Sequence, residues 1–292
     1  MLKQTRSEKI FDVFNVIILV LLCILMLYPV LYVFGRSAMS DMERAARPFA
    51  VIPGVWDFEG YKYILKSGSY ITNAYMITIL RTVIGTFLNT FFTAIFAYVI
   101  SKKYYPLRLP LTAMVVFTMW FNGGLIPNFL LVRSLGLYNN FWVMIVPGLI
   151  SVWNLLILRN FFAAIPDSLE ESAKMDGAND MVILFRVILP LSAPAIATIA
   201  LFYAVGHWNA WFDALIYINR RELWPIQVFL RELVRSVSAV SLLDAMTEVE
   251  KVPPSQSVVY STIVVATLPI LCVYPFIQKY FVKGVMVGSL KG

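Results

Sequence analysis

Long apolar stretches, separated by short polar breaks, run through most of the chain. A helix that crosses a membrane needs about 20 mostly apolar residues, and six stretches approach or exceed that length. We therefore predict an all-α, polytopic membrane protein with one transmembrane domain over residues 11–282. Its six predicted helices lie near residues 11–35, 72–101, 109–132, 140–162, 190–218 and 259–282.

Two longer polar segments interrupt this pattern, at residues 36–69 and 219–258. Lysine and arginine in short connections favour the cytoplasmic side of a membrane. Such residues precede the first helix, follow the second and end the chain: Lys3, Arg6, Lys9, Lys102, Lys103, Arg108, Lys279, Lys283 and Lys291. We predict a multi-pass protein of the cytoplasmic membrane with the tails 1–10 and 283–292 in the cytoplasm. The two long segments are then outer loops, although they hold about as many basic residues.

The first apolar stretch has the positive start of a secretory signal. It continues from about Val13 to Phe34 without an A-x-A cleavage site. We interpret it as a retained first helix.

Composition supports a membrane location. Of the 292 residues, 60% are hydrophobic and 14% are charged, more apolar surface than a soluble domain of this length covers. The net charge of +7 does not indicate a nucleic-acid partner, because no basic stripe is interleaved with stacking aromatics.

Motifs for catalysis are missing from the sequence. No glycine is followed by lysine and then serine or threonine, so there is no phosphate loop for ATP. His207 is the only histidine, and Cys23 and Cys272 are far from it in sequence, so we predict neither a metal site nor a disulfide framework. We expect no catalytic residues and no cofactor bound by this chain.

The polar segment at residues 166–190 has the signals of two short helices. Ser168 and Glu171 have the spacing of a capping box, in which both side chains satisfy free N–H groups at a helix start. Gly177 is suited to end that helix in a left-handed conformation. A second helix is predicted to begin near Asn179 or Asp180. Met181, Leu184, Phe185 and Ile188 form an apolar face suited to lie on the membrane or a partner. Physics alone leaves open an ordinary capped connection between two membrane helices.

The same segment resembles the EAA signature of bacterial ABC importer permeases. The resemblance lies in Glu171-Ser172-Ala173, in Gly177 four positions later, and in Val187 and Leu189-Pro190, with Ser172 and Val187 as mild departures. Further stretches are similar to the carbohydrate-uptake branch, and to permeases of Gram-positive bacteria for oligosaccharides from complex polysaccharides: 121–127, 135–137, 204–214, 224–232 and 278–292.

The resemblance implies the type I ABC importer permease fold and a place in a larger assembly. The expected partners are a second, related permease forming a heterodimer, a cytoplasmic ATPase dimer that uses ATP and Mg, and an extracytoplasmic solute-binding protein. In that family the signature forms a coupling helix that docks on the ATPase, and the tail of one permease reaches between the ATPase subunits. The implied docking residues are Glu170, Glu171, Ser172, Ala173, Asp176, Gly177 and Ala178.

The implied cargo is a sugar or oligosaccharide, with uronate-containing kinds included, moved by alternating access through a pathway of which this chain forms half. Polar residues within membrane helices usually face the interior of the bundle or a water-filled path. Arg81 is such a residue, and it either contacts sugar or pairs with an acid such as Asp213 or snorkels outward. The other candidates are Asn122, Trp153, Asn154, His207, Trp208, Asn209, Trp211 and Asp213.

Spacing along a helix places His207 with Trp211, and Asn209 with Asp213, on common faces. Aromatic faces stack on sugars while amides and carboxylates bind hydroxyls; the alternative is an interfacial tryptophan belt facing lipid, with hydrogen bonds between helices. In the predicted third helix, Gly123-Gly124 and Pro127 mark either a bend or a packing notch.

Three other functions remain as alternatives. An ABC permease for a different solute fits the same signature. An ion-coupled secondary transporter should show an internal repeat or an acid at mid-membrane, and neither is evident. A membrane enzyme needs paired carboxylates, and the only dense acidic set is Asp167, Glu170, Glu171 and Asp176, whose helical placement favours docking.

Overall fold

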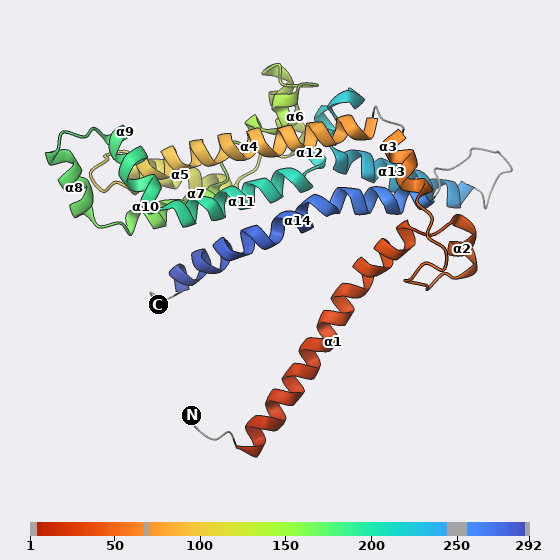
Figure 1. Ribbon diagram of the computed structural model, residues 1–292. Coiled ribbons are helices and arrows are strands. Elements are labelled where there is room, and N and C mark those ends of the chain that lie inside the picture. The colour runs from red at the N-terminus through yellow and green to blue at the C-terminus, as the bar shows by residue number, and fades with distance from the viewer. Residues whose placement is uncertain (1–4, 67–69, 244–255, 290–292) are drawn as a thin grey trace. The chain divides into compact units, whose positions relative to one another are not determined.

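The computed structural model describes residues 5–66, 70–243 and 256–289, with some side chains at the edges of these ranges left out. Every regular element in these ranges is a helix (Figure 1), which confirms the predicted all-α fold. The chain divides into two compact units, residues 1–68 with 230–268 and residues 69–229 with 269–292. Each unit is described by itself.

The first unit begins with the long helix α1 (Arg6–Ser37). A capping box starts it: Thr5 Oγ1 accepts from the Glu8 N–H at 3.3 Å, and the Glu8 carboxylate accepts from the Thr5 N–H at 2.7 Å. This helix starts earlier than the apolar pattern predicts, because capping chemistry and not hydrophobicity fixes its first residue.

The polar segment after α1 is folded and contains α2 (Asp41–Ala46) and α3 (Glu59–Lys66). Arg36 and Arg44 are buried, and each donates to the other's backbone carbonyl, at 3.1 and 2.6 Å. The Arg36 guanidinium also lies 5.8 Å from the ring of Tyr260, in α14 (Gln256–Ser289). The segment predicted as an outer loop is therefore held against the end of α1 by the hydrogen bonds of these two arginines.

The second unit is built around α4 (Tyr70–Ser101), an uninterrupted helix of 32 residues. It packs against α7 and α11. The remaining elements are α5 (Arg108–Trp120), α6 (Leu125–Ser134), η1 (Phe141–Met144), η2 (Val146–Gly148), α7 (Val152–Ala163), α8 (Asp167–Met175), α9 (Asp180–Ile183), η3 (Leu184–Ile188), α10 (Leu189–Leu191), α11 (Ala193–Asn209), α12 (Phe212–Tyr217), η4 (Arg221–Leu223) and α13 (Ile226–Leu243), the last shared with the first unit.

Three of the predicted membrane helices are broken. The third ends at Trp120 and resumes at Leu125, across Gly124 with φ +89°, so the bend suggested by Gly123-Gly124 is present. The fourth begins as two short 3-10 turns and bends by 50° before α7, and the fifth is interrupted at Ala210 and Trp211. Among the described residues, two single helices are long and apolar enough to cross a membrane, 7–37 and 71–101; two bent pairs raise this to four.

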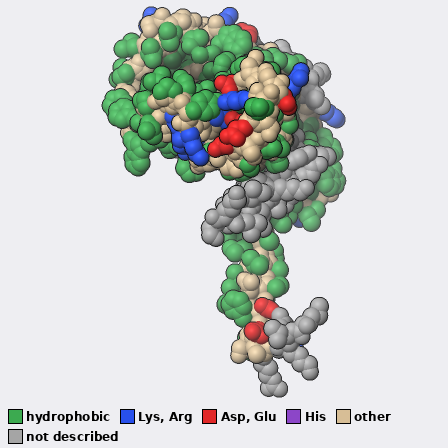
Figure 2. All heavy atoms as spheres, turned by 90° about the vertical axis from the view of Figure 1, so that its left-hand side faces the viewer, with side chains coloured by type: hydrophobic (Ala, Val, Ile, Leu, Met, Phe, Trp, Pro, Cys, Tyr) green, Lys and Arg blue, Asp and Glu red, His purple; other side chains and the backbone are tan. Residues whose placement is uncertain are grey.

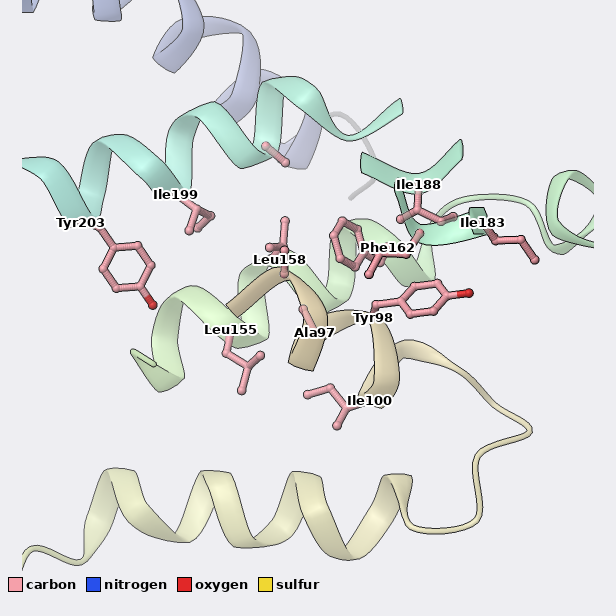
Figure 3. Packing of buried hydrophobic residues seen from close by; sticks show 13 residues of the cluster. Ala97, Tyr98, Ile100, Leu155, Leu158, Phe162, Ile183, Ile188, Ile199 and Tyr203 are labelled. Carbon is pink, nitrogen blue, oxygen red and sulfur yellow. The ribbon is translucent and has the colours of Figure 1, made fainter. Parts of the chain in front are cut away.

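The core of the second unit lies where α4, α7 and α11 meet the short helices α9 and η3. Its side chains are apolar and fully or almost fully buried (Figure 3); they include Ala97, Ile100, Leu155, Leu158, Phe162, Ile183, Ile188 and Ile199. Two polar groups inside it satisfy each other, because the hydroxyls of Thr93 and Tyr203 are 2.7 Å apart. This core joins the segment that carries the EAA signature to the longest helix of the unit.

Candidate functional site

Helix α8 is the first half of the predicted coupling segment, but it does not start as predicted. Its N-cap is Pro166 and its first turn contains Ser168, whose side chain makes no capping hydrogen bond. The predicted Ser168–Glu171 capping box is therefore wrong. Pro166, held extended with ψ 131°, sets the start of the helix ahead of the serine, and the acids Asp167 and Glu170 in the first turn favour the positive end of the helix dipole.

The end of α8 follows the prediction. Gly177 has φ +82°, a left-handed conformation that favours glycine. Its N–H donates to the Lys174 carbonyl, and the N–H of Ala178 donates to the Ala173 carbonyl, both at 3.0 Å. These are the two bonds of a Schellman motif, which satisfies carbonyls at a helix end.

The second helix starts at Asp180 with Asn179 as its cap, as predicted; the Asn179 side chain accepts from the Val182 N–H at 2.9 Å. It does not continue as a regular α-helix. Residues 184–188 form a π-helical turn, in which the Leu189 N–H reaches back to the Leu184 carbonyl. Pro190 lacks the N–H that would bond to the Arg186 carbonyl, so the regular ladder cannot continue there.

The apolar residues of this second helix lie in different environments. Ile183, Leu184 and Ile188 are buried in the core, whereas Met181 and Phe185 are exposed. Leu184 and Ile188 thus pack inside the chain, whereas Met181 and Phe185 remain on its surface, where the predicted contact with the membrane or a partner would lie. The segment then meets α11 at an angle of 85°.

The predicted docking residues do not share one environment. Glu171, Ser172, Asp176 and Gly177 are exposed, whereas Ala173 and Ala178 are half-buried against the core. Glu170 is buried and forms an ion pair with Lys102, just after the end of α4. Its predicted place on the docking surface is therefore wrong in this structure: its carboxylate faces the protein, whereas that of the neighbouring Glu171 is exposed.

Charged side chains gather at the end of the unit formed by α8 and α9 (Figure 2). Tyr104 donates to Asp180 at 3.2 Å, and Lys174 lies 4.5 Å from the Tyr104 ring and 3.7 Å from the Asp180 carboxylate. Partial desolvation of this largely exposed residue, together with the charge of Asp180, raises the pKa of Tyr104 above its ordinary value. Its hydroxyl is neutral at physiological pH and donates to Asp180.

A second polar group of interest is Arg81 in α4, which is 2% exposed. Its guanidinium forms an ion pair with Asp213 and donates to His207 Nδ1 at 3.4 Å, to the Ala210 carbonyl at 3.2 Å and to the Met144 carbonyl at 3.3 Å. Of the alternatives predicted for Arg81, pairing with the acid Asp213 is the one that the structure shows. Its hydrogen bonds tie α4 to η1 and to the break between α11 and α12, which leaves it poorly placed to contact sugar directly.

The other predicted pathway residues are dispersed. Asn209 bonds to the Val205 carbonyl of its own helix, and the break at Ala210 interrupts the predicted i, i+4 faces. Trp208 is buried with its ring against Tyr75, and Trp211 is half-buried. Asn122 accepts from the Gly124 N–H at the break before α6, Trp153 is exposed on α7, and Asn154 is buried.

A groove that is not among the features predicted from the sequence lies between α4, α11 and the π-turn. Its volume is about 610 Å³, and its accessible surface is almost wholly apolar. Small residues at four-residue spacing line it from α4: Thr82, Thr86, Thr90 and Ala94. Such spacing is the sequence signal that indicates it, since residues four apart share one face of a helix and small side chains there leave open volume beside it. Among the described residues, no three acidic, histidine or cysteine side chains converge as a metal site.

Comparison with known proteins assigns the chain to a family. Residues 2–287 match the family model described as "Binding-protein-dependent transport system inner membrane component". In Bacillus subtilis (strain 168), Protein LplC is 42% identical over 99% of this chain and 97% of its own length. The polygalacturonan/rhamnogalacturonan transport system permease protein YtcP of the same organism is 43% identical over 98% and 100%.

A solved structure agrees with the sequence relatives. The crystal structure of a bacterial ABC transporter involved in the import of the acidic polysaccharide alginate contains a chain with a TM-score of 0.86 and 34% identity, covering 96% of this chain and 100% of that one. Both the sequence and the fold are thus shared over nearly the full length. The chain belongs to the family of inner membrane components of binding-protein-dependent transport systems.

Proposed function

We propose that this chain is one of two permease subunits of an ATP-driven importer that moves an acidic oligosaccharide across the cytoplasmic membrane. The observation that carries the proposal is α8, a short helix closed by the Gly177 motif, with Glu171, Ser172 and Asp176 exposed along it. A helix fixed at its end and packed on the core through Ala173 suits docking by a partner that pushes on it. The relatives supply the class of partner and cargo.

The proposed assembly contains a second, related permease, a cytoplasmic ATPase dimer that hydrolyses ATP with Mg, and an extracytoplasmic binding protein. The coupling segment, both chain ends and the connection after α4 then lie in the cytoplasm. The predicted contact of the tail 283–292 with the ATPase concerns side chains outside the described residues. An acidic cargo is favoured by the similarity to the polygalacturonan/rhamnogalacturonan permease and to the alginate importer. Arg81 adds no support, because its guanidinium is bonded to groups within the protein.

Reconstitution tests the proposal. The chain, its neighbouring permease, ATPase and binding protein are placed in proteoliposomes, and uptake of labelled galacturonate oligomers is compared with that of neutral galactose oligomers of equal length. We expect ATP-dependent uptake that requires all four components and favours the acidic oligomers. Uptake by this chain alone under an ion gradient would instead support a secondary transporter, and equal uptake of neutral oligomers would exclude the acidic specificity.

A further inference from the structure

Lys102 is a buried lysine at the end of α4, although its position in the sequence suggests only an orientation charge. It follows Ser101, the last residue of the helix, and is 9% exposed. Its ammonium forms an ion pair with the carboxylate of Glu170, which is 7% exposed. A lysine that serves only to orient the chain has no need of a buried partner, so this pair calls for another role.

The surroundings of Lys102 fix it in place. The Tyr98 ring, one turn earlier on α4 and itself buried, lies 4.3 Å from the ammonium, within the range of a cation–π interaction. The neighbouring pair offers a direct contrast, because Lys103 lies 3.8 Å from Asp167 on the same helix α8 and both side chains are more than three-quarters exposed. Exposed pairs contribute little, whereas breaking a buried pair is costly.

The connection after α4 also holds the other end of the coupling segment. Tyr104 bonds to Asp180 at the start of α9, and its ring lies against Lys174 in the last turn of α8. The short stretch 102–104 therefore contacts α8 in its first turn and its last, and the following helix at its first residue. A displacement of α8 is resisted at each of these points.

The helix that Lys102 directly follows extends far into the unit. Between Arg81 and Ser101, α4 has neither proline nor break, so these positions are about 30 Å apart along its axis. Arg81 in turn ties α4 to η1 and to the break between α11 and α12. We call the contacts of residues 102–104 with α8 and α9 the clamp, and the bonds of Arg81 to η1 and to the break after α11 the cross-tie. Helix α4 connects the two without interruption.

We propose that Lys102 is a positioning residue for transport: through Glu170 it fixes α8 to α4, so that a push on α8 moves α4 and the Arg81 cross-tie with it. This inference rests on the proposed function for its driving force. The clamp itself is a property of the chain and is measurable without any cargo.

The test compares two pairs of neutralising substitutions in the assembled complex. The variant Lys102→Met/Glu170→Gln removes both buried charges together and so avoids stranding one of them, and Lys103→Met/Asp167→Asn is the matched exposed control. Lys102→Arg keeps the positive charge beside Tyr98. Hydrogen exchange at the backbone of α8 reports the clamp, and sugar taken up per ATP hydrolysed reports coupling.

We expect exchange in α8 to become about tenfold faster in the buried-pair variant, and uptake per ATP to fall about fivefold or more, while ATPase activity and assembly persist. The exposed-pair control should match the unaltered complex in hydrogen exchange at α8, and Lys102→Arg should retain most of the coupling. Unchanged exchange or unchanged uptake per ATP in the buried-pair variant overturns the inference. If the unaltered complex imports no oligosaccharide, the proposed function fails, and hydrogen exchange still decides whether the clamp exists.

Discussion

Gly85 lies directly against the imidazole of His207. A β-carbon placed on Gly85 would come within 2.4 Å of His207 Nε2 and within 2.8 Å of two ring carbons. The ring cannot swing away without cost, because its Nδ1 accepts a hydrogen bond from Arg81. The contact lets α4 and α11 approach each other at the level of the Arg81 cross-tie.

Replacing Gly85 by alanine should therefore destabilise the permease by about 1–3 kcal/mol, the usual range for overpacking a tight interior. The measurement is the thermal unfolding midpoint of the purified complex. Gly206→Ala is the matched control on α11, because a β-carbon there has no neighbour within 4 Å. Equal midpoints for the two variants would show that α4 and α11 tolerate a wider separation than the structure indicates.

Arg81→Lys should fail to replace arginine. The guanidinium donates to two backbone carbonyls and to His207 as well as pairing with Asp213, and an ammonium cannot reproduce that planar set of donors. We expect a loss of about 2 kcal/mol or more in unfolding free energy, discounted from the usual cost of a broken buried pair because Asp213 is partly exposed. Denaturant unfolding measures it, with exposed Arg133→Lys as control. A shift no larger than the control's would contradict the cross-tie.

The features that could be predicted from the sequence are those set by neighbours along the chain. The end of α8 at Gly177 and the cap at Asn179 depend on groups within five residues, and both are present. Of the two pairs with capping-box spacing at Thr5–Glu8 and Ser168–Glu171, the first forms the box and the second does not. At Ser168 the preceding Pro166 sets an earlier start, a competition that the four-residue pattern does not include.

The features that could not be predicted depend on partners distant in the chain. Lys102 and Glu170 are separated by 68 positions, and Arg81 and Asp213 by 132. The sequence predicts the second pair as one alternative, because an arginine in a membrane helix favours an acidic partner. The sequence does not predict the pair of Lys102 and Glu170, since a lysine at the cytoplasmic end of a membrane helix is already explained by the orientation of the helix. The π-turn also escaped prediction, although Pro190 is the residue that prevents a regular helix there.

Substitutions at Gly177 should show whether its backbone conformation or the size of the side chain limits ATP-driven uptake. Its φ of +82° costs a residue with a β-carbon about 1–2 kcal/mol, but asparagine tolerates this region better than other residues. Because no atom lies within 4 Å of a β-carbon placed there, we expect Gly177→Asn to retain more ATP-driven uptake than Gly177→Val. Equal losses in the two variants would point to a steric contact with the ATPase at this position instead of backbone strain.

The two adjacent glutamates of α8 should respond differently to the same change. Glu171 is exposed, so Glu171→Gln should leave the unfolding midpoint of the permease unchanged and weaken its association with the ATPase. Glu170→Gln leaves Lys102 charged and buried without its partner, so it should lower the midpoint while the exposed face of α8 keeps its chemistry. Thermal unfolding and co-purification of the ATPase, measured on both variants, give the comparison. If Glu171→Gln lowers the midpoint as much as Glu170→Gln, the division of α8 into a buried and a docking side is wrong, because both carboxylates would then stabilise the fold.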